Sequence, residues 1–154
     1  MADLVVPQLG PVYAALGPWV EALLRMVVGL CLVPHALRAG FGMFPNTGLP
    51  VNSMRMLAQA LDAQGFPPGR LWAPIILVTE LVGGPMLALG LFTRLVSIPI
   101  FILLALSVVS RLRSGWFWNV QGMEYPLMWA AASLYFLVNG GGALSLDRAL
   151  GWEF

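Results

Sequence analysis

Apolar residues gather into four long runs along the chain, separated by short charged or turn-forming segments. The runs predict helices over Pro18–Arg38, Leu71–Thr93, Arg94–Ser110 and Glu124–Val138. As a helix, Leu71–Thr93 rises about 34 Å, which is enough to cross a hydrocarbon core of about 30 Å. We therefore expect four membrane-spanning helices.

The segment between the first two runs is too polar to span a membrane and predicts a separate short helix over Ser53–Gln64. Met54, Leu57 and Leu61 fall on one face of that helix at spacings of three and four residues. Asn52 or Ser53 is suited to cap its start. About a dozen residues cannot cross a bilayer. We expect this helix to lie along the interface or to pack on the mouth of the bundle.

The two ends of the chain differ from the apolar runs. Residues 1–17 carry Pro7 and Pro11, which suits a strand-like or interfacial lead-in. This segment lacks the basic region of a signal peptide, so we expect the first span to remain in the mature protein. Asp147 and Arg148 predict a short polar tail after the fourth run.

Composition restricts the class of protein. Of the 154 residues, 59% are hydrophobic and only 10% are charged, and the mean hydropathy is +0.83, whereas soluble domains carry about 25% charge. A net charge of +1 argues against electrostatic binding of nucleic acid. The expected fold is all-α: a polytopic transmembrane four-helix bundle, one domain over residues 1–154, with one short interfacial helix.

Three charged residues are candidates for a cluster inside the membrane. Glu80 lies near the middle of the second run, where a carboxylate is costly unless it has a partner or a function. Glu21 and Arg25 are one turn apart on the first run. Arg25 is long enough to bridge the estimated height gap of about 10 Å to Glu80. Such a cluster either fixes helix register as a buried ion pair or serves as a proton relay or a headgroup site.

A second candidate site lies at the opposite end, where the first span ends and the fourth begins. Polar and aromatic residues gather there: His35, Arg38, Trp116, Trp118, Asn119 and Glu124. We expect His35, Arg38 and Glu124 to converge under a lid formed by residues 39–70 and 116–119. They could exchange protons with a bound ligand or a docked subunit. The alternative is an interfacial histidine bonded to a backbone carbonyl group. One histidine and one cysteine predict no metal site.

Four spaced motifs follow one another along the chain: Arg25-x3-Gly29-x5-His35, Glu80-x2-Gly83-Gly84-x5-Gly90-x2-Thr93-Arg94, Gly122-x-Glu124 and Gly140-x-Gly142-x2-Ser145-Leu146-Asp147. Their order and spacing, from about Leu24 to Leu150, resemble the DoxX family. The resemblance implies a four-helix protein of bacterial or archaeal membranes. Relatives are linked to thiosulfate:quinone oxidoreduction, to membrane oxidoreductase complexes in stress responses and to maturation of a periplasmic dehydrogenase.

The chain departs from the family pattern after His35. The family often has His-Gly-x-x-Lys there, whereas Ala36 follows His35 and Ala39 stands at the lysine position. Arg38 supplies a cation one position earlier. A role carried over for the lysine therefore does not transfer directly to this chain.

The residues and the resemblance together predict an integral, multi-pass subunit of a redox or respiratory-type complex in the bacterial cytoplasmic membrane. It would contact lipids, anchor redox partner subunits and shape a quinone site. The sequence has no flavin, haem or iron–sulfur motif, so we expect no intrinsic cofactor and no catalysis by the chain alone. The alternative is a non-catalytic structural or assembly subunit packed against a larger membrane complex.

Overall fold

A computed structural model of the chain describes residues 6–48 and 50–152, and this part of the chain contains helices, turns and no strand. The prediction of an all-α protein is confirmed. The long and short helices are α1 (Gly10–Phe41), α2 (Met54–Ala63), α3 (Gly69–Val78), α4 (Gly84–Leu89), α5 (Thr93–Arg111), α6 (Glu124–Asn139) and α7 (Leu146–Leu150). A π-helical turn, Thr79–Gly83, joins α3 to α4 into one rod. Short 3-10 turns cover Pro7–Leu9, Leu112–Ser114 and Trp118–Val120.

Three helical segments are long and apolar enough to cross a membrane, and they coincide with three of the predicted spans. They are Pro7–Phe41 with 35 residues, Gly69–Leu89 with 21 and Thr93–Ser114 with 22. The third begins at Thr93 rather than at the predicted Arg94. Helix α6 is apolar but has only 16 residues, so it is shorter than a typical spanning helix of about 20 residues.

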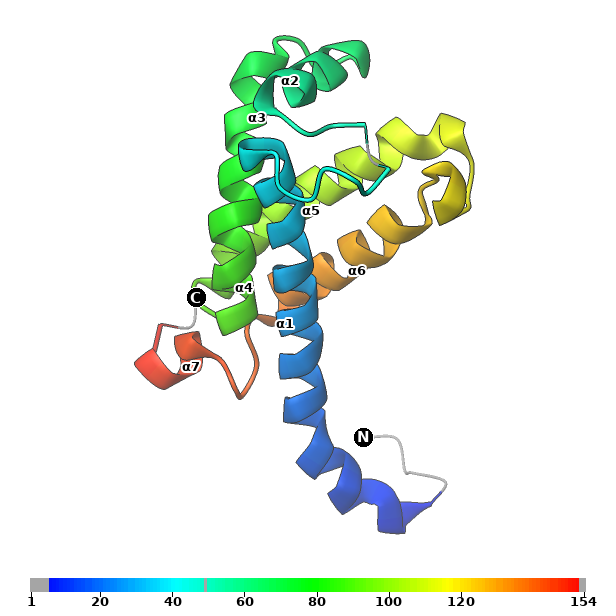
Figure 1. Cartoon of the computed structure of the whole chain (residues 1–154). Helices are drawn as coiled ribbons and strands as arrows, with labels where there is room; N and C mark the ends of the chain where they lie inside the picture. Colours follow the sequence, from blue (N-terminus) through cyan, green and yellow to red (C-terminus); the bar gives the residue numbers. More distant parts are fainter. Residues whose placement is uncertain (1–5, 49, 153–154) are drawn as a thin grey trace.

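The helices form two antiparallel pairs. Helix α1 packs against the α3–α4 rod, and α5 packs against α6. Figure 1 shows the α5–α6 pair leaving the other pair at a steep angle, so the pairs are close near α4 and separated near α2. The buried core lies where they meet and contains Val28, Leu32, Leu87, Ile100, Leu104, Ala130 and Phe136.

The two backbones of α1 and α4 touch where they cross. A Cβ atom added to Gly84 would lie 2.6 Å from the carbonyl oxygen of Gly29. A Cβ atom added to Gly29 would meet the carbonyl oxygen of Gly84 and lie 2.7 Å from the amide nitrogen of Ala88. Glycine at both positions therefore lets the helices approach closely, as small residues commonly do in membrane proteins.

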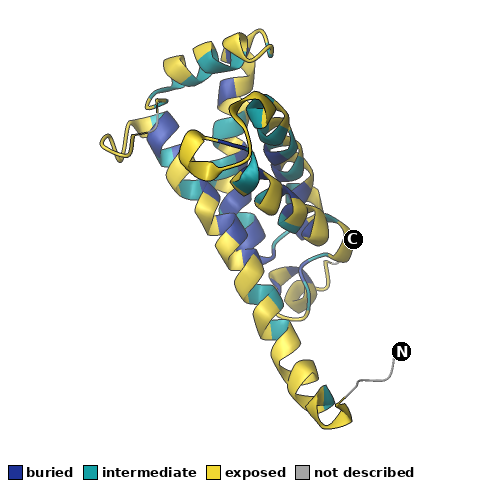
Figure 2. Cartoon of the chain, turned by 90° about the vertical axis from the view of Figure 1, so that its right-hand side faces the viewer, coloured by how far each residue is buried: buried dark blue, intermediate teal, exposed yellow. Residues whose placement is uncertain are grey.

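Helix α1 begins earlier than predicted. It starts at Gly10 rather than at Pro18, because Pro11 occupies its first turn, where a missing N–H is tolerated. Pro18 lies inside the helix. The predicted strand-like lead-in is wrong for residues 6–17, and residues 1–5 lie outside the described part. This first portion of α1 extends beyond the other helices and is exposed, as Figure 2 shows.

A short helix, α2, lies within the predicted range Ser53–Gln64 and crosses the end of α3 (Figure 1), and its place at a membrane interface stays a prediction. The Ser53 hydroxyl oxygen accepts a hydrogen bond from the Met56 amide at 3.3 Å, so Ser53 is the cap of the two predicted candidates. The corner with α3 is closed by the Gly69 amide, which donates to Asp62 Oδ1 at 2.7 Å. Side-chain capping and this bond fix α2 on α3.

The turn between α4 and α5 is held by the C-terminal helix. Gly90, at φ +71°, ends the second span at Leu89 rather than at Thr93. The Asp147 carboxylate accepts hydrogen bonds from the Phe92 amide at 2.6 Å, the Thr93 amide at 2.8 Å and the Thr93 hydroxyl at 2.7 Å. Asp147 is 4% exposed. The prediction of a polar tail is therefore wrong at this residue.

The crossing of α1 and α4 generates a stability prediction. We expect Gly29→Ala to destabilise the protein by about 1–3 kcal/mol, because a new methyl group would be forced against the backbone of α4. The matched control is Gly17→Ala on the same helix, where an added Cβ has open space. Thermal unfolding in detergent measures both. A melting temperature for Gly29→Ala equal to that of Gly17→Ala would contradict the close crossing.

The Asp147 contacts generate a second stability prediction. We expect Asp147→Ala to lower the melting temperature strongly, since buried donors left without partners cost about 1–3 kcal/mol each. Asp147→Asn should be intermediate, because its amide keeps one acceptor oxygen. Leu150→Ala, at an exposed position of the same helix, is the control. Limited proteolysis should release the C-terminal segment faster in Asp147→Ala, and an unchanged cleavage rate would argue against this anchor.

Candidate functional site

Arg25 is the centre of the polar contacts at the α4 and α7 end. Its side chain is 2% exposed. Nε donates to the Ala88 carbonyl at 3.4 Å, Nη1 to the Gly141 carbonyl and Nη2 to the Leu144 carbonyl at 2.7 Å. The guanidinium group therefore joins α1 to the end of α4 and to the loop between α6 and α7.

Glu21 lies one turn before Arg25 and contacts α6 and the same loop. Its Oε1 accepts a hydrogen bond from the Tyr135 hydroxyl at 3.1 Å. A Cβ atom added to Gly142 would meet the Glu21 carboxylate. The carboxylates of Glu21 and Asp147 both interact electrostatically with Arg25. Two members of the predicted cluster, Glu21 and Arg25, thus share one polar region.

Glu80, the third member of the predicted cluster, lies on the π-helical turn Thr79–Gly83 and is partly buried. Among the residues that the structure describes, no hydrogen bond to its carboxyl group is found. Arg25 directs its donors to backbone carbonyl groups instead. The predicted pairing of Glu80 with Arg25 is therefore not found. The residue remains a candidate on its position alone, since π-helical turns are frequent at functional sites.

His35 and Arg38 lie together at the opposite end of α1. With Pro34, Phe44 and Thr47 they line an open cleft of about 360 Å³. Arg38 is buried and donates to the Val51 carbonyl at 2.7 Å, and also to the Phe44 carbonyl and the Thr47 hydroxyl. Arg38 thereby folds the first loop over the end of α1, while the His35 side chain stays exposed.

Glu124 does not join His35. Its Oε2 accepts a hydrogen bond from the Trp118 amide at 3.2 Å, within the turn between α5 and α6. Trp118 stacks on Tyr125 with ring centroids 5.9 Å apart. Figure 1 places this turn well away from the end of α1. The structure brings together His35 and Arg38, and it groups Glu124 with Trp116, Trp118 and Asn119 in a separate turn.

Sequence reasoning assigned no site role to Asp147, Thr93 or Tyr135, which take part in the polar contacts around Arg25. A signal was present for Asp147. Ser145 caps α7 through a hydrogen bond from the Arg148 amide at 3.2 Å, and a capping serine predicts a helix rather than a tail. Within the described residues, no three His, Cys, Asp or Glu side chains form a group suited to a metal ion.

Comparison with known proteins identifies the family. The DoxX profile matches residues 20–111, more than half of the chain. An uncharacterized membrane protein of Mycobacterium tuberculosis (strain ATCC 25618 / H37Rv) is 28% identical over 145 residues, and the alignment covers 87% of this chain and 83% of that protein. No solved structure matches the chain. The matched residues run from α1 to the end of α5 and include Arg25, His35 and Glu80. The chain belongs to the DoxX family of membrane proteins.

Proposed function

We propose that the chain is an integral membrane subunit of a redox or respiratory-type complex, and that it offers a quinone a binding site beside His35. The observation that carries the proposal is the open cleft at the end of α1. The electrons would be supplied by a partner subunit, because the sequence has one histidine, one cysteine and no cofactor motif.

The lining of the cleft suits a flat apolar ring with carbonyl groups at its edge. Pro34 and Phe44 supply apolar surface, and His35 supplies a ring nitrogen that can donate a hydrogen bond. Binding sites for small molecules are commonly apolar with a few well-placed polar groups. Arg38 is engaged with the first loop, so its part is to hold the wall that carries Phe44 and Thr47.

Proton transfer is the second requirement of quinone chemistry. Histidine can change charge between pH 5 and 8, so His35 is suited to exchange a proton with a bound quinone. Glu80 is a candidate for a separate proton-carrying group, since an ionisable residue within a spanning helix is by default a functional hypothesis. The two groups lie on different helices, α1 and the α3–α4 rod.

We also propose four crossings of a bacterial cytoplasmic membrane, with α6 as the fourth. Helix α6 packs along α5, and no charged residue follows Glu124 within it. Its 16 residues rise about 24 Å, and a modest mismatch with the bilayer is tolerated by local thinning. Helix α2, with polar residues on one face, would then lie at the interface.

The alternative is a structural subunit that packs on a larger assembly through glycine faces. The structure gives less support to this alternative. Gly29 and Gly84 already contact each other within the chain, so their surfaces are not available to a partner protein. Gly17 has open space around it and remains available. The binding experiment below separates the two readings, because a purely structural subunit has no need of a quinone site.

The crossings can be tested by cysteine labelling. In a Cys31→Ser background, we expect Gly48→Cys and Ser114→Cys to react with a membrane-impermeant maleimide from one side of the membrane, and Gln8→Cys from the other. All three positions are exposed. Four crossings place positions 48 and 114 on the side opposite position 8. The fourth crossing is tested by Leu150→Cys, an exposed position after α6, which should react from the same side as position 8. Labelling of positions 114 and 150 from the same side, or of positions 8 and 114 from the same side, would contradict the proposal.

The quinone site can be tested by titrating the purified protein in mild detergent with decylubiquinone or a short-chain menaquinone. We expect binding to the wild type, and about tenfold weaker binding to His35→Ala through loss of a hydrogen bond and ring contact. Glu124→Gln is the matched control, because Glu124 lies in the separate turn. Equal affinity of His35→Ala and wild type, with both folded, would remove the cleft as a quinone site.

A further inference from the structure

Helix α1 is longer than a membrane requires. With the turn before it, α1 has 35 residues, whereas the α3–α4 rod has 21 and α5 with its last turn has 22. At about 1.5 Å per residue the longer segment rises about 52 Å, which exceeds a hydrocarbon core of about 30 Å. The excess is the first portion of α1, which extends beyond the other helices (Figure 2). The bundle therefore does not cover this portion.

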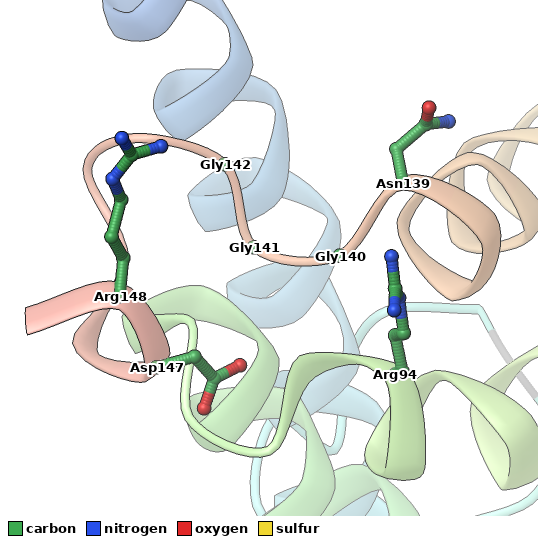
Figure 3. Close-up of a pocket in the computed structure, with 7 residues that line it drawn as sticks. All are labelled: Arg94, Asn139, Gly140, Gly141, Gly142, Asp147 and Arg148. Carbon is green, nitrogen blue, oxygen red and sulfur yellow. The ribbon is translucent and has the colours of Figure 1, made fainter. Parts of the chain in front are cut away.

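Polar groups mark the level at which the bundle ends. Arg94 and Arg148 lie on opposite sides of the glycine loop, residues 140–142 (Figure 3). Arg25 and Glu21 contact the same loop from α1. Charged side chains gather at the edge of the hydrocarbon region rather than at its centre. The residues of α1 that precede Glu21 thus lie at the level of the lipid headgroups or beyond it.

The portion of α1 beyond this level is apolar. Residues 7–20 contain no charged side chain. Val12, Tyr13, Leu16 and Trp19 are all exposed on the surface of the helix. Contiguous exposed apolar side chains of this kind indicate contact with a membrane or a partner. This portion of α1 therefore requires an apolar environment that the rest of the chain does not supply.

One stripe of exposed apolar residues runs along α1 from this portion into the membrane. Its members recur at spacings of three and four residues, which place them on one helix face. They are Val12, Leu16, Val20, Leu23, Val27 and Leu30. The helical period puts this stripe opposite the buried Arg25, Val28 and Leu32, so its spanning part faces lipid. Val12 and Leu16 continue a lipid-facing surface.

The opposite face of the first portion is formed by small residues. Gly10, Ala14 and Gly17 follow one another at spacings of four and three, so they share a face. A Cβ atom added to Gly17 would have open space around it. This face carries no large apolar side chain, and it can be turned toward headgroups and water at little cost. The two faces therefore differ in apolar surface although neither is charged.

A bend directs the first portion of α1 away from the helix axis. Pro18 lies inside α1. It has no N–H to donate, and its ring crowds the carbonyl group of Ala14, which is a common cause of bending. Figure 1 shows the first turns of α1 leaving the direction of the rest of the helix. Tyr13 and Trp19, on either side of Pro18, are of the residue types enriched at the headgroup level.

We propose that residues 10–20 lie along the bilayer interface at the Arg25 end, with Val12 and Leu16 against the acyl chains and Ala14 and Gly17 toward the headgroups. Lipid is the occupant of the exposed stripe, because the stripe is continuous with the lipid-facing surface of the spanning part. Interfacial helices with basic residues depend on anionic lipids. Residues 7–20 contain no lysine or arginine, so this contact is independent of lipid charge.

The test uses the full chain in phosphatidylcholine nanodiscs, with single spin-labelled cysteines in a Cys31→Ser background. We expect labels at Val12→Cys and Leu16→Cys to collide with oxygen, which concentrates in lipid. Labels at Ala14→Cys and Gly17→Cys should collide with a water-soluble nickel complex. The nickel collision rate should be at least about threefold lower at position 16 than at position 14. Added phosphatidylglycerol or salt should leave this difference unchanged.

The matched controls are Leu30→Cys, in the lipid-facing part of α1, and Ser114→Cys, in an exposed turn. Circular dichroism confirms that each variant is folded. Equal nickel collision rates at positions 14 and 16, or loss of the difference in salt, would overturn the proposal. Coupling between labels that disappears on dilution with unlabelled protein would also overturn it, because a second copy would then cover the stripe. None of these outcomes depends on quinone binding at His35.

Discussion

The packing of the molecule at the α4 and α7 end depends on one buried guanidinium group. Arg25 is a charged side chain within a spanning helix, so it requires partners that offset the loss of water. Carbonyl groups of Ala88, Gly141 and Leu144 provide them. Carbonyl oxygens at a helix end and in a loop lack intrahelical donors, and the arginine satisfies them. One side chain of α1 thus provides hydrogen-bond donors to the end of α4 and to two positions in the loop between α6 and α7.

Asp147 provides the hydrogen-bond acceptors that the first amides of α5 lack. The first amides of a helix lack acceptors, and the carboxylate accepts from Phe92 and Thr93. Arg25 therefore holds the glycine loop from one side, while Asp147 joins the segment after it to the α4–α5 turn. Because both anchors act on the same stretch of chain, the C-terminal segment is part of the folded core at this end rather than an appendage.

The sequence predicted what depends on local pattern. Hydropathy located the long helices, and the spacing of Met54, Leu57 and Leu61 located α2. It did not predict which groups meet. The position of a residue along a helix does not tell which way its side chain points around the helix axis. Arg25 and Glu80 were estimated to lie at similar depths in the membrane, but the Arg25 donors bind backbone carbonyl groups instead. Asp147 was missed because a polar residue near a terminus resembles a solvated tail until its partners on another segment are known.

The predicted contact between His35 and Glu124 was not found, and the reason also explains how the two ends of the protein differ. His35 and Glu124 share a height if four helices run nearly parallel, but the α5–α6 pair diverges from α1 (Figure 1). At the Arg25 end, glycine contacts and buried polar groups draw the pairs together. At the His35 end, Arg38 donates to Val51, Phe44 and Thr47 of the first loop. The turn between α5 and α6 has a hydrogen bond of its own, from the Trp118 amide to Glu124. A fold tightly packed at one end and open at the other places an accessible cleft beside His35, which is the geometry that a small membrane-borne ligand or a partner helix requires.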